Sequence, residues 1–583
     1  MLEGYPCLSR IIADLDDHLV TSHPSFFGEN PTHPFSPLKP YKVIHDHLWG
    51  TSRFTWRELV LIDSPLLQRL RGIHQTGLAY LVYPSARHSR FEHSLGVLTV
   101  ASRVFDALQQ RAPKELREIA ANISGTPDPD KASTLIGQWR QELRLAALLH
   151  DTGHSLHSHA SEQIYSDIDL LKQAADELST FVGKEKGAGE VLSFCLARTA
   201  AVSSLLAMAE KKVMAPESAE DLVGSVSMSN VSLLIVGRSY HPLLQFLGDI
   251  VSSGFDADKL DYLLRDASAA GLPLRYDLER YLYTVFLDPE PLTDGESELE
   301  KLYSSVGSAP SRCAPQGDVA FPYYDAYRLR LPKTAMSTIE QIIICKLMLF
   351  SYIYHHAKVR SAEGLLVCLL RIQTIEWRKT GYTDEQLLRK FLSIEDSVLD
   401  TSEFAGSANP IIAEYAYRIK NRLLPRQVFR LSAAATTKRD GAILKDFFIQ
   451  VEDKANRRDR IRSLDLEIGW QLLAITPDLA PSPEMALLVA GVWVDVPKVP
   501  SFEDTSVIVG KSRAATPPKI QDVFPIGQWT EAYEAHRFFI RIFAFSEHLE
   551  SAGVAAKAAL KKVLRIENEA FYEEAGKERT PEY

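Results

Sequence analysis

The chain has 583 residues, of which 45% are apolar and 24% are charged, and its formal net charge is −10. This composition is typical of globular proteins and excludes a chain that is disordered over most of its length. The acidic balance disfavours a protein whose main ligand is long nucleic acid, because such proteins need a strongly basic face. At about 150 residues per domain, the length predicts three or four domains, or one large body with appendages.

The sequence predicts a soluble protein of the reducing cytoplasm, with no membrane partner. The longest apolar run, residues 485–494, is well short of the ~20 residues that cross a bilayer. The N-terminus lacks the basic segment and apolar core of a secretory signal. The five cysteines lie far apart and form no Cys-x-x-Cys pair, which argues against a disulfide framework.

The N-terminal half of the sequence predicts a helical body that follows an arm. Residues 1–40 contain several prolines and are expected to form the arm. The apolar spacing is helical from residue 57 to about 112, with an interruption near residues 83–84. A polar loop at 125–131 precedes a helix over 135–149, which leads into a histidine-rich stretch at 150–159. A further helix is expected at about 256–270.

The C-terminal half predicts an insertion, more helices and a change of character. Residues 288–315 are rich in Pro, Gly, Ser and acidic residues, so we expect an exposed insertion near 288–330. Helical spacing returns over 337–378. After residue 426, segments such as QVFRLSA and ALLVAGVWVDVP favour strands, and the tail from 528 to 575 is expected to be helical. The predicted fold is mainly α, with a body over 41–426 and a smaller mixed α/β C-terminal subdomain over 427–583.

Two motifs combine imidazole and carboxylate groups. His150 and Asp151 are adjacent at the end of the predicted helix, and His93 lies in the segment RFEHS. Imidazole and carboxylate together suit Mn, Fe, Co, Ni or Zn. With 17 histidines in the chain, a single His-Asp dipeptide also arises by chance, so this motif alone is weak evidence for a metal site.

A third motif, DADKLDYLLRD, begins at residue 256. On a helix Asp258, Tyr262 and Asp266 share one face at i, i+4 and i+8, with Lys259 beside them. The leucines of the motif lie on the other side. The pattern therefore predicts a helix with one face in the core and one face that presents charged and phenolic groups. The alternative is a solvated helix whose charges form salt bridges, which is the commoner use of such a pattern.

RFEHS, HDTGH and DADKLDYLLRD, in this order, resemble the motifs of HD-domain dNTP triphosphohydrolases. That family includes the sterile-alpha-motif/HD-domain enzyme of animals and bacterial dGTPase-like relatives. The resemblance covers roughly residues 42–280 and continues more faintly to about residue 500, without a sterile alpha motif. It implies that 41–426 is an HD catalytic domain. It also implies hydrolysis of a dNTP, with a dGTP-like substrate preferred, to deoxynucleoside and inorganic triphosphate.

The resemblance also assigns roles to residues of this chain. One divalent transition metal is implied at His93, His150, Asp151 and Asp258, with Mg²⁺ accompanying the nucleotide. Substrate contacts are implied at Gln75, Arg90, Lys259, Tyr262, Asp266 and Tyr354. Of these, Arg90 and Lys259 suit the triphosphate, and Tyr262 leaves no room for a 2′-hydroxyl. The catalytic residues are implied to be His154, His159 and Glu162, because a histidine with a carboxylate partner suits protonation of the leaving 5′ oxygen. His157 has no counterpart in the family and is expected to be structural.

Two further segments, YKVIHDHLWG (41–50) and LIDSPLLQRLRGIHQTG (61–77), resemble the family's regulatory segments. They imply an allosteric nucleotide site formed by Lys42, Val43, Asp63, Gln68 and Arg71. Such sites are shared between subunits, so a homo-oligomer is implied, either a dimer or a tetramer. The alternative is an ordinary helix start, with Asp63 or Ser64 as the cap and Pro65 in the first turn.

One departure from the family leaves other functions open. Gly189 stands where the family usually has the histidine of a His-Glu pair, in the segment GEVLS. A protein that has exchanged catalysis for nucleotide sensing is therefore one alternative. Another is an HD phosphodiesterase acting on a cyclic nucleotide or an alarmone. The sequence does not decide between roles in dNTP-pool control and antiviral defence.

Overall fold

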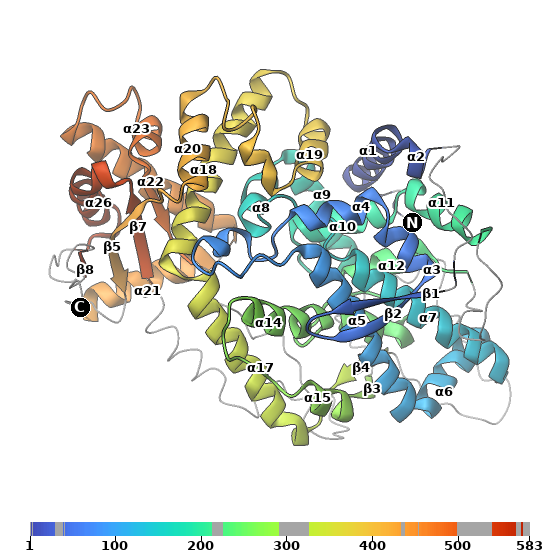
Figure 1. Cartoon of the computed structure of the whole chain (residues 1–583). Coiled ribbons are helices and arrows are strands. Elements are labelled where there is room, and N and C mark those ends of the chain that lie inside the picture. The colour runs from blue at the N-terminus through green and yellow to red at the C-terminus, as the bar shows by residue number, and fades with distance from the viewer. Residues whose placement is uncertain are drawn as a thin grey trace.

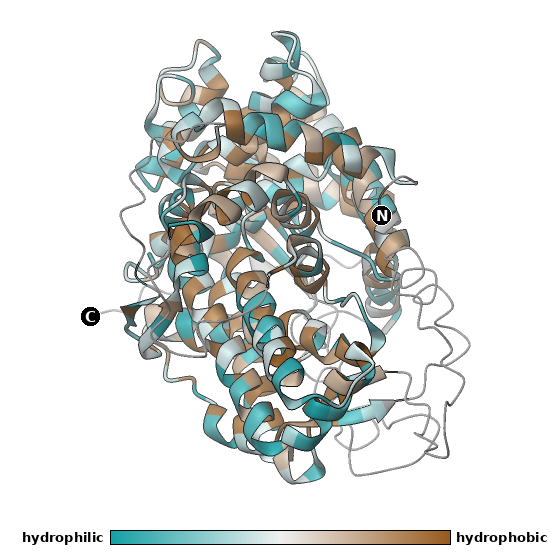
Figure 2. Ribbon diagram, turned by 90° about the vertical axis from the view of Figure 1, so that its right-hand side faces the viewer, coloured by the Kyte–Doolittle hydropathy of each residue, from teal (hydrophilic) through white to brown (hydrophobic). Residues whose placement is uncertain are grey.

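The computed structural model describes residues 2, 4–28, 39, 41–212, 225–290, 326–432, 438–452, 454–497, 539–566 and 573–574. These residues form a mainly helical body and a smaller C-terminal subdomain that combines a sheet with helices (Figure 1). The expected fold class is confirmed. Apolar residues lie where the helices of the body pack together, and polar residues mark their outer faces (Figure 2).

The first part of the body runs from the N-terminus to α12. Its elements are α1 (Pro6–Ser22), α2 (Pro24–Phe27), β1 (Tyr41–Asp46), β2 (Gly50–Thr55), α3 (Trp56–Ile62), α4 (Pro65–Gln68), η1 (Arg69–Gly72), η2 (Gly77–Leu81), α5 (Arg90–Arg111), α6 (Pro113–Ser124), α7 (Pro129–Leu149), α8 (His159–Tyr165), α9 (Asp169–Val182), α10 (Ala188–Ala197), α11 (Ala200–Glu210) and α12 (Met228–Ile235). Strands β1 and β2 form an antiparallel hairpin.

The second part of the body runs from η4 to α20. Its elements are η4 (Pro242–Leu244), α13 (Gln245–Val251), α14 (Ala257–Ala269), α15 (Leu278–Thr284), β3 (Phe286–Glu290), β4 (Ala326–Arg330), η6 (Lys333–Ala335), α17 (Met336–Leu349), η7 (Phe350–Tyr354), α18 (Ala357–Lys379), α19 (Asp384–Ser393), η8 (Asp396–Asp400) and α20 (Pro410–Lys420). Strands β3 and β4 pair antiparallel at the two ends of the predicted insertion, whose residues 291–325 lie outside the described residues.

The segment predicted as an N-terminal arm contains helix α1, which packs on the body. Its apolar positions, Leu8, Ile11, Leu15 and Leu19, are buried. The carboxylate of Glu177 on α9 accepts hydrogen bonds from the first backbone N–H groups of α1, Cys7 and Leu8, at 3.0 and 2.8 Å. Arg389 on α19 donates to Asp14 at 2.9 Å. Helix α1 is therefore joined to segments far along the chain.

Helix α7 begins earlier than the sequence spacing predicts. The predicted loop at 125–131 ends at Asp128, whose carboxylate accepts from the backbone N–H groups of Asp130 and Lys131 at 3.0 and 3.4 Å. Pro129 occupies the first helical position, where its missing N–H costs nothing. The expectation of a loop up to residue 131 was therefore wrong by three residues. The predicted helix at 256–270 is confirmed as α14, capped by Asp256.

A buried ion pair joins α3 to α7. Arg144 on α7 donates to Glu58 on α3 at 2.6 and 2.7 Å, and Gln141 donates to the same carboxylate at 2.8 Å. Arg144 also donates to the Arg53 carbonyl of β2 at 2.8 Å. Because Glu58 and Arg144 are almost fully buried, this network fixes the hairpin and α3 against the helix that leads to His150.

The predicted helical stretch at 337–378 is divided into two α-helices. Helix α17 leads into the π-helical turn η7, and α18 starts after His356, whose ring accepts from the Lys358 N–H at 3.2 Å. The stretch Lys333–Tyr354 is long and apolar enough to cross a membrane by length and composition. Half of that apolar window is buried inside the protein, and core helices of soluble proteins pass the same test of length and composition. Among the described residues, only the bent pair α10–α11 would pass the same test, if read as one span.

The C-terminal subdomain is built on a four-stranded antiparallel sheet in the order β6-β7-β5-β8. Its elements are β5 (Arg426–Ser432), α21 (Lys438–Glu452), α22 (Lys454–Ile475), α23 (Pro483–Ala490), β6 (Trp493–Asp495), β7 (Phe539–Ala544), η10 (Ser546–His548), α26 (Leu549–Leu564) and β8 (Glu573–Glu574). The helical tail predicted at 528–575 was wrong over β7, where FIRIFA forms a fully buried strand. Its β-branched and aromatic residues favour a strand. Within that tail, 549–564 is helical, 573–574 forms the short strand β8, and 528–538 and 567–572 lie outside the described residues.

Buried apolar side chains fall into two clusters. One runs from Leu8 to Leu424 and includes Phe545, and the other lies between Phe429 and Ile566. Charged contacts cross between them: Arg360 on α18 pairs with Asp495 on β6 at 2.8 Å, and Arg541 on β7 donates to the His355 carbonyl at 2.8 Å. The subdomain is therefore attached to the body through α18, close to the turn that carries Tyr354.

Candidate metal and phosphate site

The four predicted metal ligands come from three helix ends. His93 lies in the first turn of α5, His150 and Asp151 follow the last residue of α7, and Asp258 lies in the first turn of α14. Helix α5 packs against both α7 and α14. Because residues at a helix end are not enclosed by further turns of the same helix, these four side chains meet in one place.

The ligand atoms lie close together. His93 Nε2 is 3.0 Å from Asp258 Oδ1 and 3.6 Å from Asp151 Oδ2. His150 Nε2 is 3.4 Å from Asp151 Oδ1 and 3.8 Å from Asp258 Oδ1. His93 and Asp151 are almost fully buried, and His150 is about 10% exposed at its side chain. This spacing suits four atoms around one cation.

The chemistry of the donor set fits a metal. His93 Nδ1 lies 2.8 Å from Asp261 Oδ2, and His150 Nδ1 lies 2.8 Å from the Ala147 carbonyl. Carboxylate and carbonyl oxygens only accept hydrogen bonds, so both Nδ1 atoms must carry hydrogen. When both rings are neutral, each directs its Nε2 lone pair at carboxylates that also have only lone pairs. A cation satisfies such a set, and the other ring nitrogen fixes the tautomer as in known metal sites.

The carboxylates of the site favour positive charge between them, either as a proton on His93 or as a metal cation. Burial opposes a charge on His93, but hydrogen bonds with Asp258 and Asp261 raise its pKa to about 10. Burial likewise opposes ionisation of Asp151, but Arg90 and the neighbouring histidines hold its pKa well below the usual range. The carboxylates thus remain ionised and favour positive charge between them.

Asp261 is a further residue of the candidate site that the sequence reasoning missed. It lies one turn after Asp258 and receives, besides His93, the guanidinium of Arg265 at 2.7 and 3.0 Å and the indole N–H of Trp49. Gly96 on α5 provides the space, since a Cβ there would overlap Asp261 and Arg265. Its position within the DADKLDY motif could have identified it. It was overlooked because the sequence reasoning assigned that side of the helix to the core.

Arg90 is placed to bind an anion beside the four ligands. Its Nη1 donates to Asp151, and its Nε donates to Ser158 Oγ at 2.8 Å. Its Nη2 is buried and has no hydrogen-bond partner among the described residues. One donor of the guanidinium therefore remains for a ligand in this cavity, and phosphate is a suitable one.

Two lysines carry positive charge to the other side of Asp258. Lys259 Nζ donates to Asp256 at 2.7 Å and to the Ser253 carbonyl at 2.8 Å. Lys346 on α17 was not predicted as a site residue. Burial and the charge of Lys259 lower the pKa of Lys346 to about 8, although Asp256 and Asp258 oppose this. The two ammonium groups thus lie near each other and near a predicted metal ligand, as expected where a polyanion binds.

The residues predicted around the sugar form a second group. Asp266 on α14 lies 2.7 Å from His88 Nε2 and accepts a hydrogen bond from the Tyr354 hydroxyl. Tyr262, one turn before Asp266, is close enough to influence the pKa of Tyr354. The Gln75 N–H donates to the His88 carbonyl at 3.0 Å, and its side-chain oxygen is buried without a partner among the described residues. The structure therefore brings these four predicted residues together and adds His88.

His154, His159 and Glu162 form a third group, next to Asp151. His154 Nε2 is 3.4 Å from Asp151 Oδ1, and its ring meets the His159 ring edge-on at 5.4 Å. His159 Nδ1 is 3.2 Å from Glu162 Oε2. Burial and the charge of Arg90 lower the pKa of His154 to about 3. His154 is thus neutral at physiological pH, whereas His159 is largely exposed.

The structure explains what Gly189 does in place of the expected histidine. Its N–H donates to Glu162 Oε1 at 3.1 Å. A Cβ at this position would lie 2.7 Å from Cε1 and 2.9 Å from Nε2 of His154. His154 packs directly against the glycine, so any side chain at residue 189 would displace it. The glycine therefore leaves the space in which the His154 ring lies beside Asp151.

The five predicted regulatory residues lie on the surface around α3, α4 and η1. Val43 on β1 is 62% exposed, and Lys42 and Asp63 are also exposed. Arg71 donates to Gln68 Oε1 at 2.9 Å and stacks on the ring of Phe91 at 3.7 Å. Since Phe91 follows Arg90, this segment directly contacts the start of the helix that carries the site. Ser64 occupies the N-cap position of α4 before Pro65, but its side chain makes no cap hydrogen bond and donates instead to the Leu61 carbonyl at 2.6 Å.

Residues 90–221 match the family model of the HD domain. The chain is also similar to deoxynucleoside triphosphate triphosphohydrolase SAMHD1 from Danio rerio, with 27% identity over 42% of this chain and 36% of that protein. The corresponding protein from Bos taurus is 29% identical over 41% of this chain and 38% of its own length. The similarity therefore spans less than two fifths of these enzymes.

Longer similarities lead to proteins without a described activity. An uncharacterized protein from Methanocaldococcus jannaschii is 22% identical over 87% of this chain and 80% of its own length. The crystal structure of a hypothetical protein from Aquifex aeolicus covers 88% of this chain and 99% of its own, with a TM-score of 0.51 and 19% identity. At that identity the likeness shows the fold alone.

Proposed function

We propose that the protein hydrolyses a dNTP to deoxynucleoside and inorganic triphosphate. The premise is that residues 90–221 match the HD domain of metal-dependent phosphohydrolases. The observation that carries this proposal is the meeting of two imidazole Nε2 atoms and two carboxylates beside the free donor of Arg90. A dGTP-like substrate is proposed on the resemblance alone. Similarity to SAMHD1 proteins supports the reaction class.

His93, His150, Asp151 and Asp258 would hold one divalent transition metal, and Mg²⁺ would accompany the nucleotide. When bound, such a cation would polarise a phosphoryl oxygen and lower the pKa of a water molecule. In the proposed reaction the oxygen of water forms a bond to the α-phosphorus, and the bond from that phosphorus to the 5′ oxygen breaks. The cationic side chains of Arg90 and Lys259 would hold the triphosphate and stabilise its growing charge. We assign the same role to Lys346, because its ammonium group lies near that of Lys259.

The 5′ oxygen must receive a proton as it leaves. His159 is suited to deliver it, because its ring is largely exposed and Glu162, 3.2 Å from its Nδ1, orients the imidazole. Glu162 also binds the backbone of Gly189, which fixes the carboxylate. The neutral His154 would orient Asp151 and the attacking water. Tyr262, Asp266, Tyr354 and Gln75 would surround the deoxyribose.

The regulatory site is a separate part of the proposal. Lys42, Val43, Asp63, Gln68 and Arg71 would bind a second nucleotide between subunits of a homo-oligomer, either a dimer or a tetramer. The stacking of Arg71 on Phe91 supports a route from that surface to Arg90. We also propose a cytoplasmic location, and domain boundaries near residues 40 and 426, the second of which lies between the two buried clusters.

The test is a matrix of each dNTP as substrate against each NTP or dNTP as activator, with Mn²⁺ or Mg²⁺ and separation of products. Release of inorganic triphosphate and deoxynucleoside in equal amounts is the expected result. Release of pyrophosphate, or hydrolysis of cyclic nucleotides or alarmones instead, would replace the proposal by an HD phosphodiesterase. Binding of dNTP without any product under every activator would indicate a nucleotide sensor, the alternative that Gly189 suggests.

Replacing Gly189 by alanine should lower turnover about tenfold or more. The new Cβ would push the His154 ring away from Asp151, and small displacements at a reacting centre cost one to two orders of magnitude in rate. Alanine has a higher helix propensity than glycine, so the substitution does not lower the helix propensity of α10, and circular dichroism verifies that the variant is folded. Steady-state kinetics of triphosphate release measures the effect.

Gly553→Ala in α26 is the matched control, because its Cβ would meet only a methyl group of Val428 at 3.3 Å. It should leave turnover unchanged. Equal turnover in Gly189→Ala and the unmodified protein would show that the position of His154 does not matter for the reaction.

A further inference from the structure

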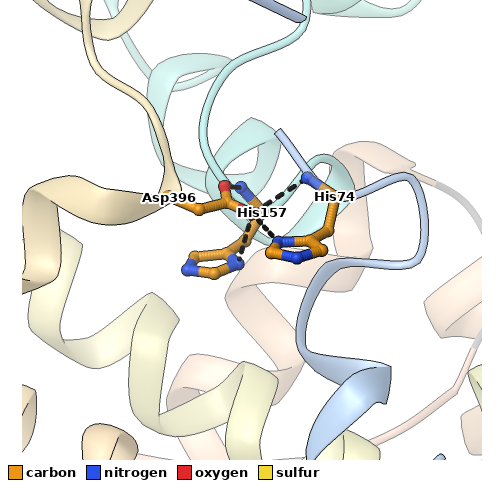
Figure 3. A group of neighbouring side chains, drawn as sticks. All are labelled: His74, His157 and Asp396. Carbon is orange, nitrogen blue, oxygen red and sulfur yellow. Dashed lines mark hydrogen bonds and ion pairs between the residues drawn. The ribbon is translucent and has the colours of Figure 1, made fainter. Parts of the chain in front are cut away.

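Three segments far apart in the sequence meet at Asp396. His74 lies between η1 and η2, His157 lies in the loop from α7 to α8, and Asp396 starts η8 (Figure 3). Asp396 Oδ2 is 2.5 Å from His74 Nδ1 and 3.2 Å from His157 Nδ1. The same carboxylate accepts from the backbone N–H groups of His74 and His157, at 2.9 and 2.6 Å. None of these side chains belongs to the site described above.

His157 is buried, and its ring is not satisfied by hydrogen bonds. Its side chain is 1% exposed. Neither ring nitrogen has a hydrogen bond of good geometry among the described residues, although Asp396 and the backbone of Gly77 lie near it. Asp396 Oδ2 already accepts two hydrogen bonds from His74, one from its backbone and one from its ring. A buried imidazole that is left without a partner requires an explanation.

We propose that His74, His157 and Asp396 bind a second divalent transition-metal ion of the Zn²⁺ class. The three ligand atoms all lie within 4.8 Å of one another. Two ligands about 2.0–2.1 Å from a tetrahedral Zn²⁺ are roughly 3.3–3.4 Å apart, close to the present 3.2 Å between His157 and Asp396. The His74 ring would move away from the carboxylate by less than 1 Å.

A cation explains this cluster better than hydrogen bonds alone. With a metal between them, both Nδ1 atoms would be satisfied by one ion instead of competing for one oxygen. The two rings are nearly parallel, 5° apart with centroids at 6.4 Å, and both present Nδ1 to Asp396 (Figure 3). The side chain of His74 is 24% exposed, which gives an ion a way in and leaves room for water as a further ligand. Imidazole and carboxylate ligands suit Zn²⁺, Fe²⁺ or Ni²⁺.

The location of the cluster indicates that the metal would position nearby loops of the candidate site. Ser158, next to His157, donates to the His74 carbonyl at 2.7 Å and accepts from Arg90 Nε at 2.8 Å. Gln75 follows His74 in the chain. An ion at the cluster would therefore fix the loops that carry Gln75 and the Arg90 contact, without touching the substrate.

The experiment is equilibrium dialysis of the full chain against Zn²⁺, with the metal-to-protein ratio determined by mass spectrometry. Two equivalents are expected for the unmodified protein and one for Asp151→Asn, which removes the HD site. None is expected for Asp151→Asn combined with His157→Gln. His47→Gln, at an exposed histidine of the hairpin turn, is the matched control and should keep two.

Asp396→Asn serves as a second test variant, and circular dichroism verifies that each variant is folded. Zn²⁺ should raise the Tm of folded Asp151→Asn but not that of Asp151→Asn with His157→Gln. If Asp151→Asn binds no Zn²⁺, or if His157→Gln and Asp396→Asn both keep two equivalents, the proposal is wrong. Because these readouts measure binding in a protein without its HD site, they do not depend on the proposed dNTP hydrolysis.

Discussion

Asp151→Asn is expected to lower the rate of triphosphate release by about a thousandfold or more, which corresponds to about 4 kcal/mol of activation free energy. Asp151 is the carboxylate nearest to three groups of the site at once: Arg90, His150 and His154. Asparagine keeps the shape but loses the charge and presents an amide on one side. The cation would lose a ligand, and buried Arg90 would lose its counter-charge, which is costly in itself.

The measurement combines ion chromatography of released triphosphate with metal analysis of the same sample. Metal content should fall by one equivalent relative to the unmodified protein. Asp128→Asn is the control, because Asp128 caps the far end of the same helix and asparagine caps equally well; activity and metal content should stay unchanged. Full activity with unchanged metal in Asp151→Asn would disprove the assignment of the site.

Glu58→Ala is expected to lower the free energy of unfolding by about 3–5 kcal/mol, the usual cost of breaking a buried ion pair from one side. The substitution leaves Arg144, 4% exposed, without a counter-charge and Gln141 without an acceptor. It also removes the bond from Glu58 to the Thr55 N–H at the start of α3, which is 2.8 Å long. Urea unfolding followed by circular dichroism measures the change.

The pair of Arg140 and Asp106 is the matched control on the same helix. It also has two hydrogen bonds, of 2.7 and 3.0 Å, but its side chains are 34% and 40% exposed. Because solvent screens exposed pairs, Asp106→Ala should cost less than about 1 kcal/mol. If both substitutions cost the same, burial does not set the strength of the Glu58–Arg144 pair.

The helices of the body were predictable because their signals are local. The apolar spacing from 135 to 149 and the pattern of α14 are contained in short windows, and such windows determine most helical segments. The start of α7 was misjudged because two short-range devices, Asp128 as cap and Pro129 at the first position, had been read only as loop residues. Strand β7 was missed because a short buried strand and a buried helix have similar apolar composition.

The residues of the candidate site were also predictable only in part. The order of the three motifs was enough to name the residues that the structure brings together around Asp151, since each motif sits at a helix end. Asp261 lies within a motif but on the side of the helix assigned to the core, whereas His88 and Lys346 could not be found from local patterns, because their roles arise only from contacts with α14. The role of Gly189 depends on a contact with His154, 35 positions earlier in the printed sequence, that no spacing rule contains.

Helix α1 has a consequence for the order of events during synthesis. Its apolar face leaves the ribosome before the segments that it contacts, because Glu177 follows Cys7 by 170 residues and Arg389 follows Asp14 by 375. At about 5–20 residues per second, roughly 20–75 seconds separate Asp14 from Arg389. During that time the four buried leucine and isoleucine positions of α1 have no complete partner surface. Helix α1 is therefore exposed to aggregation while the rest of the body is made, and it acquires its full set of contacts only after the HD motifs have been made.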